Sequence, residues 1–312
     1  MSHAASKATL YGLIAILLWS TVVGMIRSVS EFFGPLGGAA LIYSVGTLCL
    51  LLVLGRPRIQ SFPKAYVLIG SALFVAYELC LSLSLGYAHN RMQAIEVGMI
   101  NYLWPCLTLL LMLVLNRQKP RWWLYPGLAL SLLGITWILS GDSGWSPQQM
   151  AANIISNPLS YGLAFSGALI WAVYCNVTQR LAQGHNGVTL FFGLTALVLW
   201  GQYGLSQEAP LHFSLTSSLA VLFAGGAMGS AYGLWNVGIL RGNMTLLASA
   251  SYFTPVLSTF FAALVLRQPL SWPFWQGVLM VTLGSILCWW ATRQPPRCAP
   301  NATSSPPLSP PS

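Results

Sequence analysis

Ten runs of apolar residues, separated by short polar connections, dominate the sequence. Each run holds roughly the 20 residues that a helix needs to cross the hydrocarbon core of a bilayer. No small-residue cleavage site follows the first run, so we interpret it as a retained helix and not as a signal peptide. The pattern predicts an all-α integral membrane protein with ten transmembrane helices. We place them at residues 8–26, 36–55, 65–86, 94–115, 122–140, 158–179, 188–205, 215–239, 245–266 and 272–292.

The remaining segments are polar. The connection 141–157 contains Ser146-Pro147, a pair typical of a helix cap and first turn, so we expect a short surface helix up to about Ile155. From Pro295 the chain is rich in Pro, Ser and Thr, which predicts a disordered tail. We therefore divide the chain into a five-helix unit (1–140), an extracytoplasmic connection (141–157), a second five-helix unit (158–294) and a tail (295–312).

Two predicted spans contain a proline near the middle. Pro105 ends the segment Asn101-Tyr102-Leu103-Trp104-Pro105, and Pro255 ends Ser251-Tyr252-Phe253-Thr254-Pro255, 150 residues later. Proline has no N–H, so the carbonyl four residues earlier loses its helical partner. In a bilayer that carbonyl must be satisfied by protein or face a lined cavity. The sequence therefore predicts matching kinks in the fourth and ninth helices, next to a central site.

Other positions repeat at the same offset. Gly127 and Gly134 match Gly277 and Gly284 after 150 residues. Each unit holds an odd number of helices, so the second unit would insert upside down relative to the first. Inverted repeats of this kind form transporters with a site near the midplane, between the halves. Further matches are Gly34 with Gly184, Gly37 with Gly187, Arg91 with Arg241 and, at an offset of 152, Trp19 with Trp171.

Composition supports the membrane class. Charged residues make up 6% of the chain and hydrophobic residues 55%, which is too few charges for a soluble domain of this length. The net charge of +9 is scattered over short connections, so membrane-flanking charges explain it better than binding to nucleic acid. The six cysteines show no paired spacing, and five lie in apolar runs, which favours small core residues over disulfides or metal ligands.

The distribution of basic residues predicts an orientation. Of the 14 Lys and Arg residues, eleven fall on the side that holds both termini, and positive charges mark the cytoplasmic side. We therefore expect both termini in the cytoplasm. The eleven are Lys7, Arg56, Arg58, Lys64, Arg117, Lys119, Arg121, Arg180, Arg241, Arg293 and Arg297, against Arg27, Arg91 and Arg267 on the other side, where Glu31, Asp142 and Glu208 also fall.

Several motifs carry a family resemblance. A Trp midway through the first and sixth spans, combined with Pro-kinked fourth and ninth spans, is similar to the drug/metabolite transporter superfamily. The segments 18–21, 93–99, 101–105, 235–240 and 251–257 more closely resemble the bacterial aromatic amino acid exporters of that superfamily. The resemblance runs to about Arg293. It implies an inner-membrane exporter of phenylalanine, tyrosine, tryptophan and related amphipathic compounds, for which we expect no cofactor, a lipid environment and a monomer.

Two carboxylates lie inside predicted spans, where an ionisable group is costly and is a functional candidate by default. Glu78 lies deep in the third span. It is either a contact for an ammonium group or a proton, or a hydrogen-bonded packing residue. Glu96 begins the fourth span near the outer surface and either takes part in function or pairs with Arg91, five residues earlier.

Aromatic residues in the middle of spans are explained poorly by the belts of aromatic residues that form at membrane interfaces. Rings lining a cavity would suit a planar apolar substrate. Asn101 and Asn236 either hold the amino or carboxyl group of that substrate or bond between helices. The predicted site comprises Trp19, Tyr77, Glu78, Asn101, Tyr102, Trp104, Trp171, Tyr232, Asn236 and Tyr252, with Trp235 beside them and the kinks at Pro105 and Pro255.

Two other function classes were compared with this prediction. A membrane-embedded enzyme is disfavoured because all four His residues fall in connections or the first residues, and because no metal-ligand cluster, nucleophile motif or phosphate-binding glycine loop is present. A multidrug or cation exporter that uses Glu78 as its charge is the alternative within transport. Export of zwitterionic aromatic compounds would favour the first prediction, and resistance to quaternary ammonium dyes the second.

Overall fold

The computed structural model describes residues 3–115, 121–141 and 145–292, and these residues form helices and no strands. The first part contains α1 (His3–Phe33), α2 (Pro35–Leu54), a π-helical turn η2 (Tyr66–Gly70) that continues into α3 (Ser71–Gly86), α4 (Arg91–Asn101), α5 (Trp104–Leu115) and α6 (Leu124–Leu139). The second contains α7 (Pro147–Ser156), α8 (Pro158–Leu181), α9 (Val188–Leu205), α10 (Leu215–Arg241), α11 (Met244–Ser251), α12 (Thr254–Leu266) and α13 (Trp272–Thr292). A short 3₁₀ turn, η1 (Ile59–Ser61), precedes η2.

The helices match a multi-pass membrane protein. In the described chain, eight helical segments are long and apolar enough to cross a bilayer, and two shorter apolar helices are Leu124–Leu139 and Thr254–Leu266. The second of these is short because the predicted ninth span is divided between α11 and α12. The predicted surface helix is α7, whose first turn is capped by Ser146, with Oγ accepting from the N–H of Gln149 at 3.3 Å.

The two proline segments interrupt their helices at equivalent positions. Helix α4 ends at Asn101 and α5 begins at Trp104, while α11 ends at Ser251 and α12 begins at Thr254. At the first break the N–H groups of Tyr102 and Leu103 donate to carbonyls only three residues back, at 3.0 and 3.1 Å. Phe253 makes the same type of bond at the second break, at 3.0 Å. The last turn before each proline is therefore tightened.

Helix α1 is longer than predicted. The sequence predicts an end at Ile26, but the helix continues to Phe33. Arg27 and Glu31 follow the apolar run, and their side chains pair across one helical turn at 3.1 Å. Charged pairs at this spacing support a helix. The apolar run therefore stops where these charged residues begin, but the helix continues through them.

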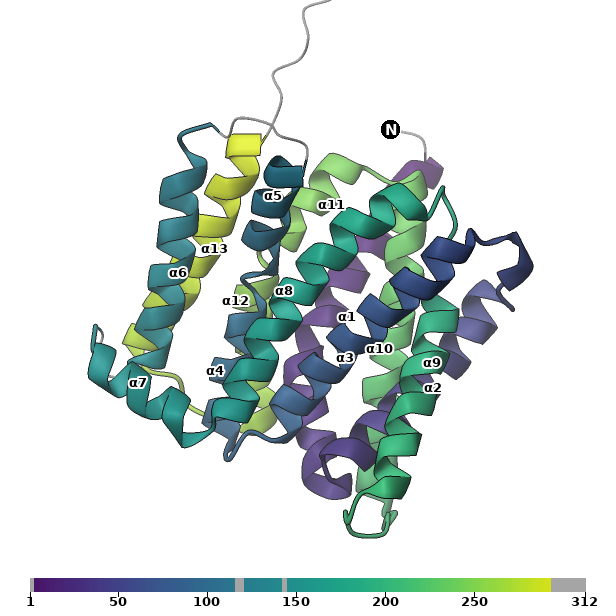
Figure 1. Ribbon diagram of the computed structural model, residues 1–312, viewed down its shortest axis with the longest axis horizontal. Coiled ribbons are helices and arrows are strands. Elements are labelled where there is room, and N and C mark those ends of the chain that lie inside the picture. The colour runs from purple at the N-terminus through teal and green to yellow at the C-terminus, as the bar shows by residue number, and fades with distance from the viewer. Residues whose placement is uncertain (1–2, 116–120, 142–144, 293–312) are drawn as a thin grey trace, which may run out of the picture.

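The long helices pack in pairs that join the two halves of the chain. Helix α1 lies along α10, α3 along α8, α2 along α9 and α6 along α13. Figure 1 shows α6 and α13 on one side of the molecule, α2 and α9 on the other, and the remaining long helices between them. The midsection is thus built from both halves.

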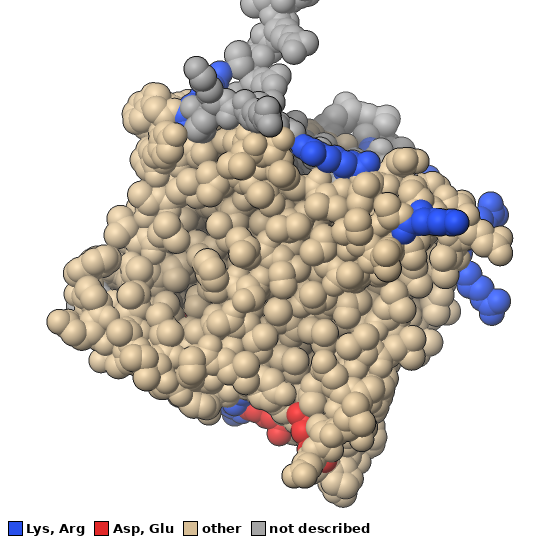
Figure 2. All heavy atoms as spheres, in the orientation of Figure 1, with Lys and Arg blue, Asp and Glu red and all other residues tan. Residues whose placement is uncertain are grey.

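Charged side chains gather at opposite ends of the bundle. In Figure 2, most of the visible Lys and Arg side chains lie at the end where the N-terminus is found, and the visible carboxylates lie at the other end. At that second end Glu208 accepts hydrogen bonds from the N–H groups of Leu36 and Gly37 at the start of α2, at 3.0 to 3.2 Å. Arg117, Lys119, Asp142, Arg293, Arg297 and the predicted tail lie outside the described residues.

Candidate functional site

A cluster of rings occupies the middle of the bundle. We define the central aromatic cluster as Trp19, Phe74, Tyr77, Trp104, Trp171, Tyr232 and Trp235. Trp171 on α8 contacts the rings of Tyr77, Phe74 and Trp104 at centroid distances of 4.3, 6.1 and 6.4 Å. These rings come from α1, α3, α5, α8 and α10.

Two further contacts connect this group with α1. Tyr232 lies 6.0 Å from Phe74 and 5.2 Å from Trp19, in edge-to-face arrangements that aromatic rings prefer. Trp19 also contacts Trp235, at 5.3 Å. Trp19, Trp104, Trp171 and Tyr232 are half-buried and are not sealed in the core. The structure thus brings five predicted aromatic site residues into one connected cluster: Trp19, Tyr77, Trp104, Trp171 and Tyr232.

Glu78 lies directly behind this cluster and is tied to two helices. Its side chain is fully buried. One oxygen accepts from the Tyr43 hydroxyl of α2 at 2.5 Å, and the other from the Tyr232 hydroxyl of α10 at 3.0 Å. Tyr43 also lies 3.1 Å from the Ser82 hydroxyl. Both carboxyl oxygens are therefore engaged by the protein, and the arrangement connects α2, α3 and α10.

Asn101 and Tyr102 lie at the first helix break and are buried. The Asn101 amide lies beside the Tyr77 hydroxyl, but its Oδ1 has no hydrogen-bond partner within the described chain. This oxygen faces α8 near Gly167, where an added Cβ would lie 3.9 Å away. A buried acceptor without a partner is costly. Asn101 thus presents an unused acceptor to α8 beside Gly167, which lies one helical turn before Trp171.

The other predicted site residues do not join the cluster. Tyr102 interacts with Ser258 on α12. Tyr252 contacts the ring of Trp289 on α13 at 5.7 Å. Asn236 is half-buried next to Trp235, and the structure shows no side-chain hydrogen bond for it to the described chain. The prolines Pro105 and Pro255 occupy the second position of α5 and α12.

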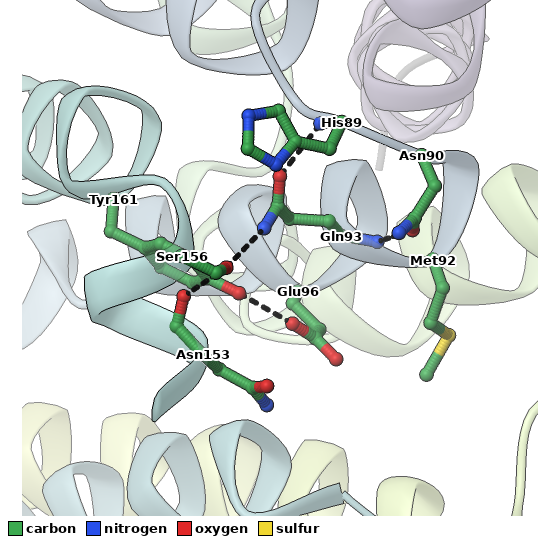
Figure 3. A pocket seen from close by; sticks show the side chains of 8 residues that line it. All are labelled: His89, Asn90, Met92, Gln93, Glu96, Asn153, Ser156 and Tyr161. Carbon is green, nitrogen blue, oxygen red and sulfur yellow. Dashed lines mark hydrogen bonds between the residues drawn. The ribbon is translucent and has the colours of Figure 1, made fainter. Parts of the chain in front are cut away.

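A cavity of about 350 Å³ opens at the end of the molecule opposite the N-terminus. It lies between α4, α7 and the first turn of α8 (Figure 3). Glu96 is nearly buried there, and its Oε2 accepts from the Tyr161 hydroxyl at 2.7 Å. The lining residues are His89, Asn90, Met92, Gln93, Glu96, Asn153, Ser156 and Tyr161.

Amide side chains hold the walls of this cavity in place. Gln93 Oε1 accepts from the His89 N–H at 2.7 Å and from the Asn157 side chain at 2.9 Å. Asn153 Nδ2 donates to the carbonyl of Leu139 at 2.8 Å. These bonds join the start of α4 to the junction of α7 and α8, and α7 to the end of α6, so the cavity has a fixed polar frame.

The alternative in which Glu96 pairs with Arg91 is wrong. Arg91 instead donates to Glu31 of α1 at 2.7 Å and to the carbonyl of Leu266 at 3.2 Å. Residues five apart on a helix point to different faces. Arg91 therefore turns to α1 and α12, while Glu96 turns to Tyr161 of α8.

Several residues of these two regions were not predicted from the sequence. Tyr43 and Phe74 are aromatic residues in the middle of predicted spans. The same pattern selected Tyr77 and Tyr232, so Tyr43 and Phe74 could have been predicted from the sequence. Asn153 and Tyr161 gave no such signal, because only the folded position of α7 and α8 brings them to Glu96. In the described chain no group of three or more His, Cys, Asp or Glu residues is suited to hold a metal ion.

Comparisons with known proteins agree with a transport protein. The model of the EamA-like transporter family matches residues 6–140 and again residues 158–290. The aromatic amino acid exporter YddG of Salmonella typhimurium is 54% identical over 93% of this chain and 99% of its own, and that of Escherichia coli is 55% identical over 92% and 98%.

More distant relatives extend the same result. The aromatic amino acid exporter YddG of Ancylobacter novellus is 28% identical over 81% of this chain and 87% of its own. A solved crystal structure at 26% identity superposes with a TM-score of 0.63 and covers 92% of this chain and 98% of that one. With most of its length matched in two copies, the chain belongs to the EamA-like transporter family, within the drug/metabolite transporter superfamily.

Proposed function

We propose that this protein exports phenylalanine, tyrosine, tryptophan and related amphipathic compounds across the bacterial inner membrane. The observation that carries the proposal is the central aromatic cluster, which combines tilted and edge-on rings with the unpaired Oδ1 of Asn101. Aromatic faces recognise a planar apolar side chain through area and ring geometry, and an amide oxygen accepts from an ammonium group. Two relatives at 54–55% identity are aromatic amino acid exporters, which supports the same substrate class.

The substrate would lie between the rings that the two halves contribute. Trp19 and Trp104 come from the first half, and Trp171 and Tyr232 from the second. In the proposed pose the substrate ring packs against Trp171 and Trp104, and its ammonium group reaches Asn101. Asn236 on α10, and Tyr102 and Tyr252 at the two helix breaks, are further polar groups that stay part of the proposal for the carboxyl end.

We also propose that the two halves are inverted repeats of five transmembrane helices each, with residues 1–140 as the first and 158–294 as the second. The contact between α6 and α13 supports this. A Cβ added to Gly127 would lie 2.9 Å from the Gly284 carbonyl oxygen, and one added to Gly134 would lie 2.8 Å from that of Gly277.

These two glycine contacts exchange with one another under the 150-residue offset, because Gly127 corresponds to Gly277 and Gly134 to Gly284. A contact that maps onto itself in this way is the signature of a two-fold relation. Helices α6 and α13 run antiparallel here, because Gly127 near the start of α6 meets Gly284, while Gly134 further along α6 meets the earlier Gly277 of α13. Opposite insertion lets the halves exchange conformations, so we propose alternating access around the central aromatic cluster, in a monomer.

The charge distribution supports an orientation with both termini in the cytoplasm. Reporter fusions after Arg56 and Arg117 are expected to be cytoplasmic, and fusions after residues 142 and 208 extracytoplasmic. A reversed result at two of these sites would contradict the orientation.

The substrate proposal is tested by phenylalanine efflux from proteoliposomes. Removing a half-buried aromatic ring that packs on the substrate loses about 1–3 kcal/mol of apolar contact, so Trp171→Ala is expected to weaken apparent affinity about fivefold or more. Trp290→Ala is the matched control, because Trp290 is half exposed on α13. Wild-type efflux by Trp19→Ala, Trp104→Ala and Trp171→Ala alike would place the site elsewhere.

A further inference from the structure

The cavity around Glu96 lies outside the central aromatic cluster and has its own chemistry. We propose that it is an outer subsite that binds the primary ammonium group of the exported compound, with Glu96 as the anion. This inference rests on the proposed function, because it assigns a second binding site to the same substrate. The ligand class is a primary amine that bears an apolar group, such as an aromatic amino acid or an arylalkylamine.

The charge of the cavity favours a cation. Glu96 is the one carboxylate among its eight lining residues, and neither Lys nor Arg is among them. The Arg side chains on neighbouring segments are used elsewhere. Arg91 pairs with Glu31, and Arg27 pairs with Glu31 and donates to the carbonyl of Ala88 at 2.6 Å. Within the described residues, neither Lys nor Arg therefore supplies a counter-charge to Glu96.

The carboxylate also has a free oxygen. Tyr161 donates to Oε2, and no hydrogen bond from the described chain reaches Oε1. Figure 3 shows this second oxygen turned to the open space between Asn153 and Met92. A nearly buried carboxylate gains from a partner that brings a charge and N–H donors, and an ammonium group offers both.

The remaining walls suit the rest of such a ligand. Met92 and the ring of Tyr161 provide apolar surface beside Glu96, and thioether groups pack well against aromatic rings. The volume of about 350 Å³ falls within the range of small-molecule sites, roughly 300–1,000 Å³. Apart from His89, the cavity has no basic side chain for a carboxylate, so we expect selection for the amine and not for the acid.

The test uses thiol labelling from the extracytoplasmic side. Ser156 lines the cavity and is exposed, so Ser156→Cys places a reactive group there in the full-length protein, and the wild-type chain gives the labelling background. Cationic and anionic methanethiosulfonate reagents are compared, each relative to its rate with a free thiol. One unit charge a few ångströms away favours the cationic reagent by about fivefold or more even in water.

Glu96→Gln in the Ser156→Cys protein is expected to abolish most of this preference. Glu208→Gln is the matched control, because it removes one charge at the same end of the molecule but outside the cavity. Tyr161→Phe is a second variant that keeps the carboxylate and should keep the preference. An unchanged preference in Glu96→Gln that elutes as a monodisperse protein would overturn the proposal, as would loss of the preference in Tyr161→Phe.

Ligand protection tests the chemical class. Phenylalanine and 2-phenylethylamine are expected to slow labelling at position 156, whereas 3-phenylpropionate, which lacks the amine, should not. Equal protection by all three, or protection that persists in Glu96→Gln, would refute ammonium recognition. Phenylalanine efflux is measured in the same liposomes, so absent efflux with intact amine protection would reject only the proposed function, and efflux without amine protection only the subsite.

Discussion

The regions around Glu78 and Glu96 both hold a buried carboxylate against tyrosine hydroxyls, yet they differ in how many carboxylate oxygens accept a hydrogen bond. At Glu78 two phenols occupy both oxygens, and the side chain has no exposed surface. At Glu96 one phenol occupies one oxygen, and the other faces a cavity. Glu78 therefore connects helices, while Glu96 keeps an acceptor for something that arrives from outside.

The comparison teaches that depth in a span does not by itself identify a binding group. A deep carboxylate is expensive and so attracts functional interpretation, but the cost can be offset entirely by neighbouring side chains. What distinguishes a binding group is an unused hydrogen-bonding atom next to open space. By that criterion Glu96 is a stronger candidate than Glu78, although Glu78 was the more conspicuous in the sequence. The cation-exporter alternative loses support for the same reason.

The largest effect is expected when the carboxylate of Glu78, whose two oxygens both accept hydrogen bonds, is removed. Glu78→Ala leaves the hydroxyls of Tyr43 and Tyr232 without their acceptor in a buried place, and each unsatisfied group costs about 1–3 kcal/mol. We expect a loss of about 2–5 kcal/mol in the free energy of unfolding, measured by thermal or denaturant unfolding in detergent. Glu78→Gln keeps shape and an acceptor and should lose only about 1 kcal/mol.

Glu78→Gln also tests whether this residue senses protons. If Glu78 acts only as a connection between helices, phenylalanine transport by the variant keeps the wild-type dependence on pH. A changed pH profile in a variant that folds normally would show that Glu78 titrates during transport, and the contrast with Glu96 would then be wrong.

A smaller effect is expected from removing one hydroxyl at each site. Tyr43→Phe leaves an oxygen of Glu78 unpaired where water has no access, and should cost about 1–3 kcal/mol of stability. Tyr161→Phe frees an oxygen of Glu96 beside the cavity, where water can replace the lost bond, and should cost below about 1 kcal/mol. Equal losses measured for the two variants would remove the distinction between the regions.

The sequence predicted the helices well because the bilayer imposes a simple rule on apolar length. Proline at 105 and 255 located both helix breaks, since the lost N–H acts locally. The end of α1 was missed because Arg27 and Glu31 satisfy one another, a pairing that an apolar pattern does not register. The tightened turns before each proline and the π-helical turn at Tyr66–Gly70 likewise depend on the folded backbone.

The central aromatic cluster was predicted only in part, for a physical reason. Trp19, Trp171 and Tyr232 were predicted because rings in the middle of a span are rare as interface residues. Tyr252 was grouped with them by repeat position, but it packs on Trp289. The cavity at Glu96 could not be predicted, because it depends on how α7 covers the start of α4, which no local pattern specifies. Contacts between segments that are distant in the sequence decide which polar atom is left without a hydrogen-bond partner.

The smallest effect is expected at the ion pair between Arg91 and Glu31. Arg91 binds Glu31 and not Glu96, and both side chains are partly exposed. Ion pairs of this kind contribute about 0.2–1 kcal/mol and weaken with salt. Arg91→Gln should therefore lower stability by less than about 1 kcal/mol at low salt and by less still at high salt, as measured by unfolding in detergent. It should also leave the charge preference of labelling at position 156 unchanged, because Arg91 does not line the cavity. If Arg91→Gln instead altered that preference, Arg91 would act on Glu96 after all, and the separation of the two charges would have to be abandoned.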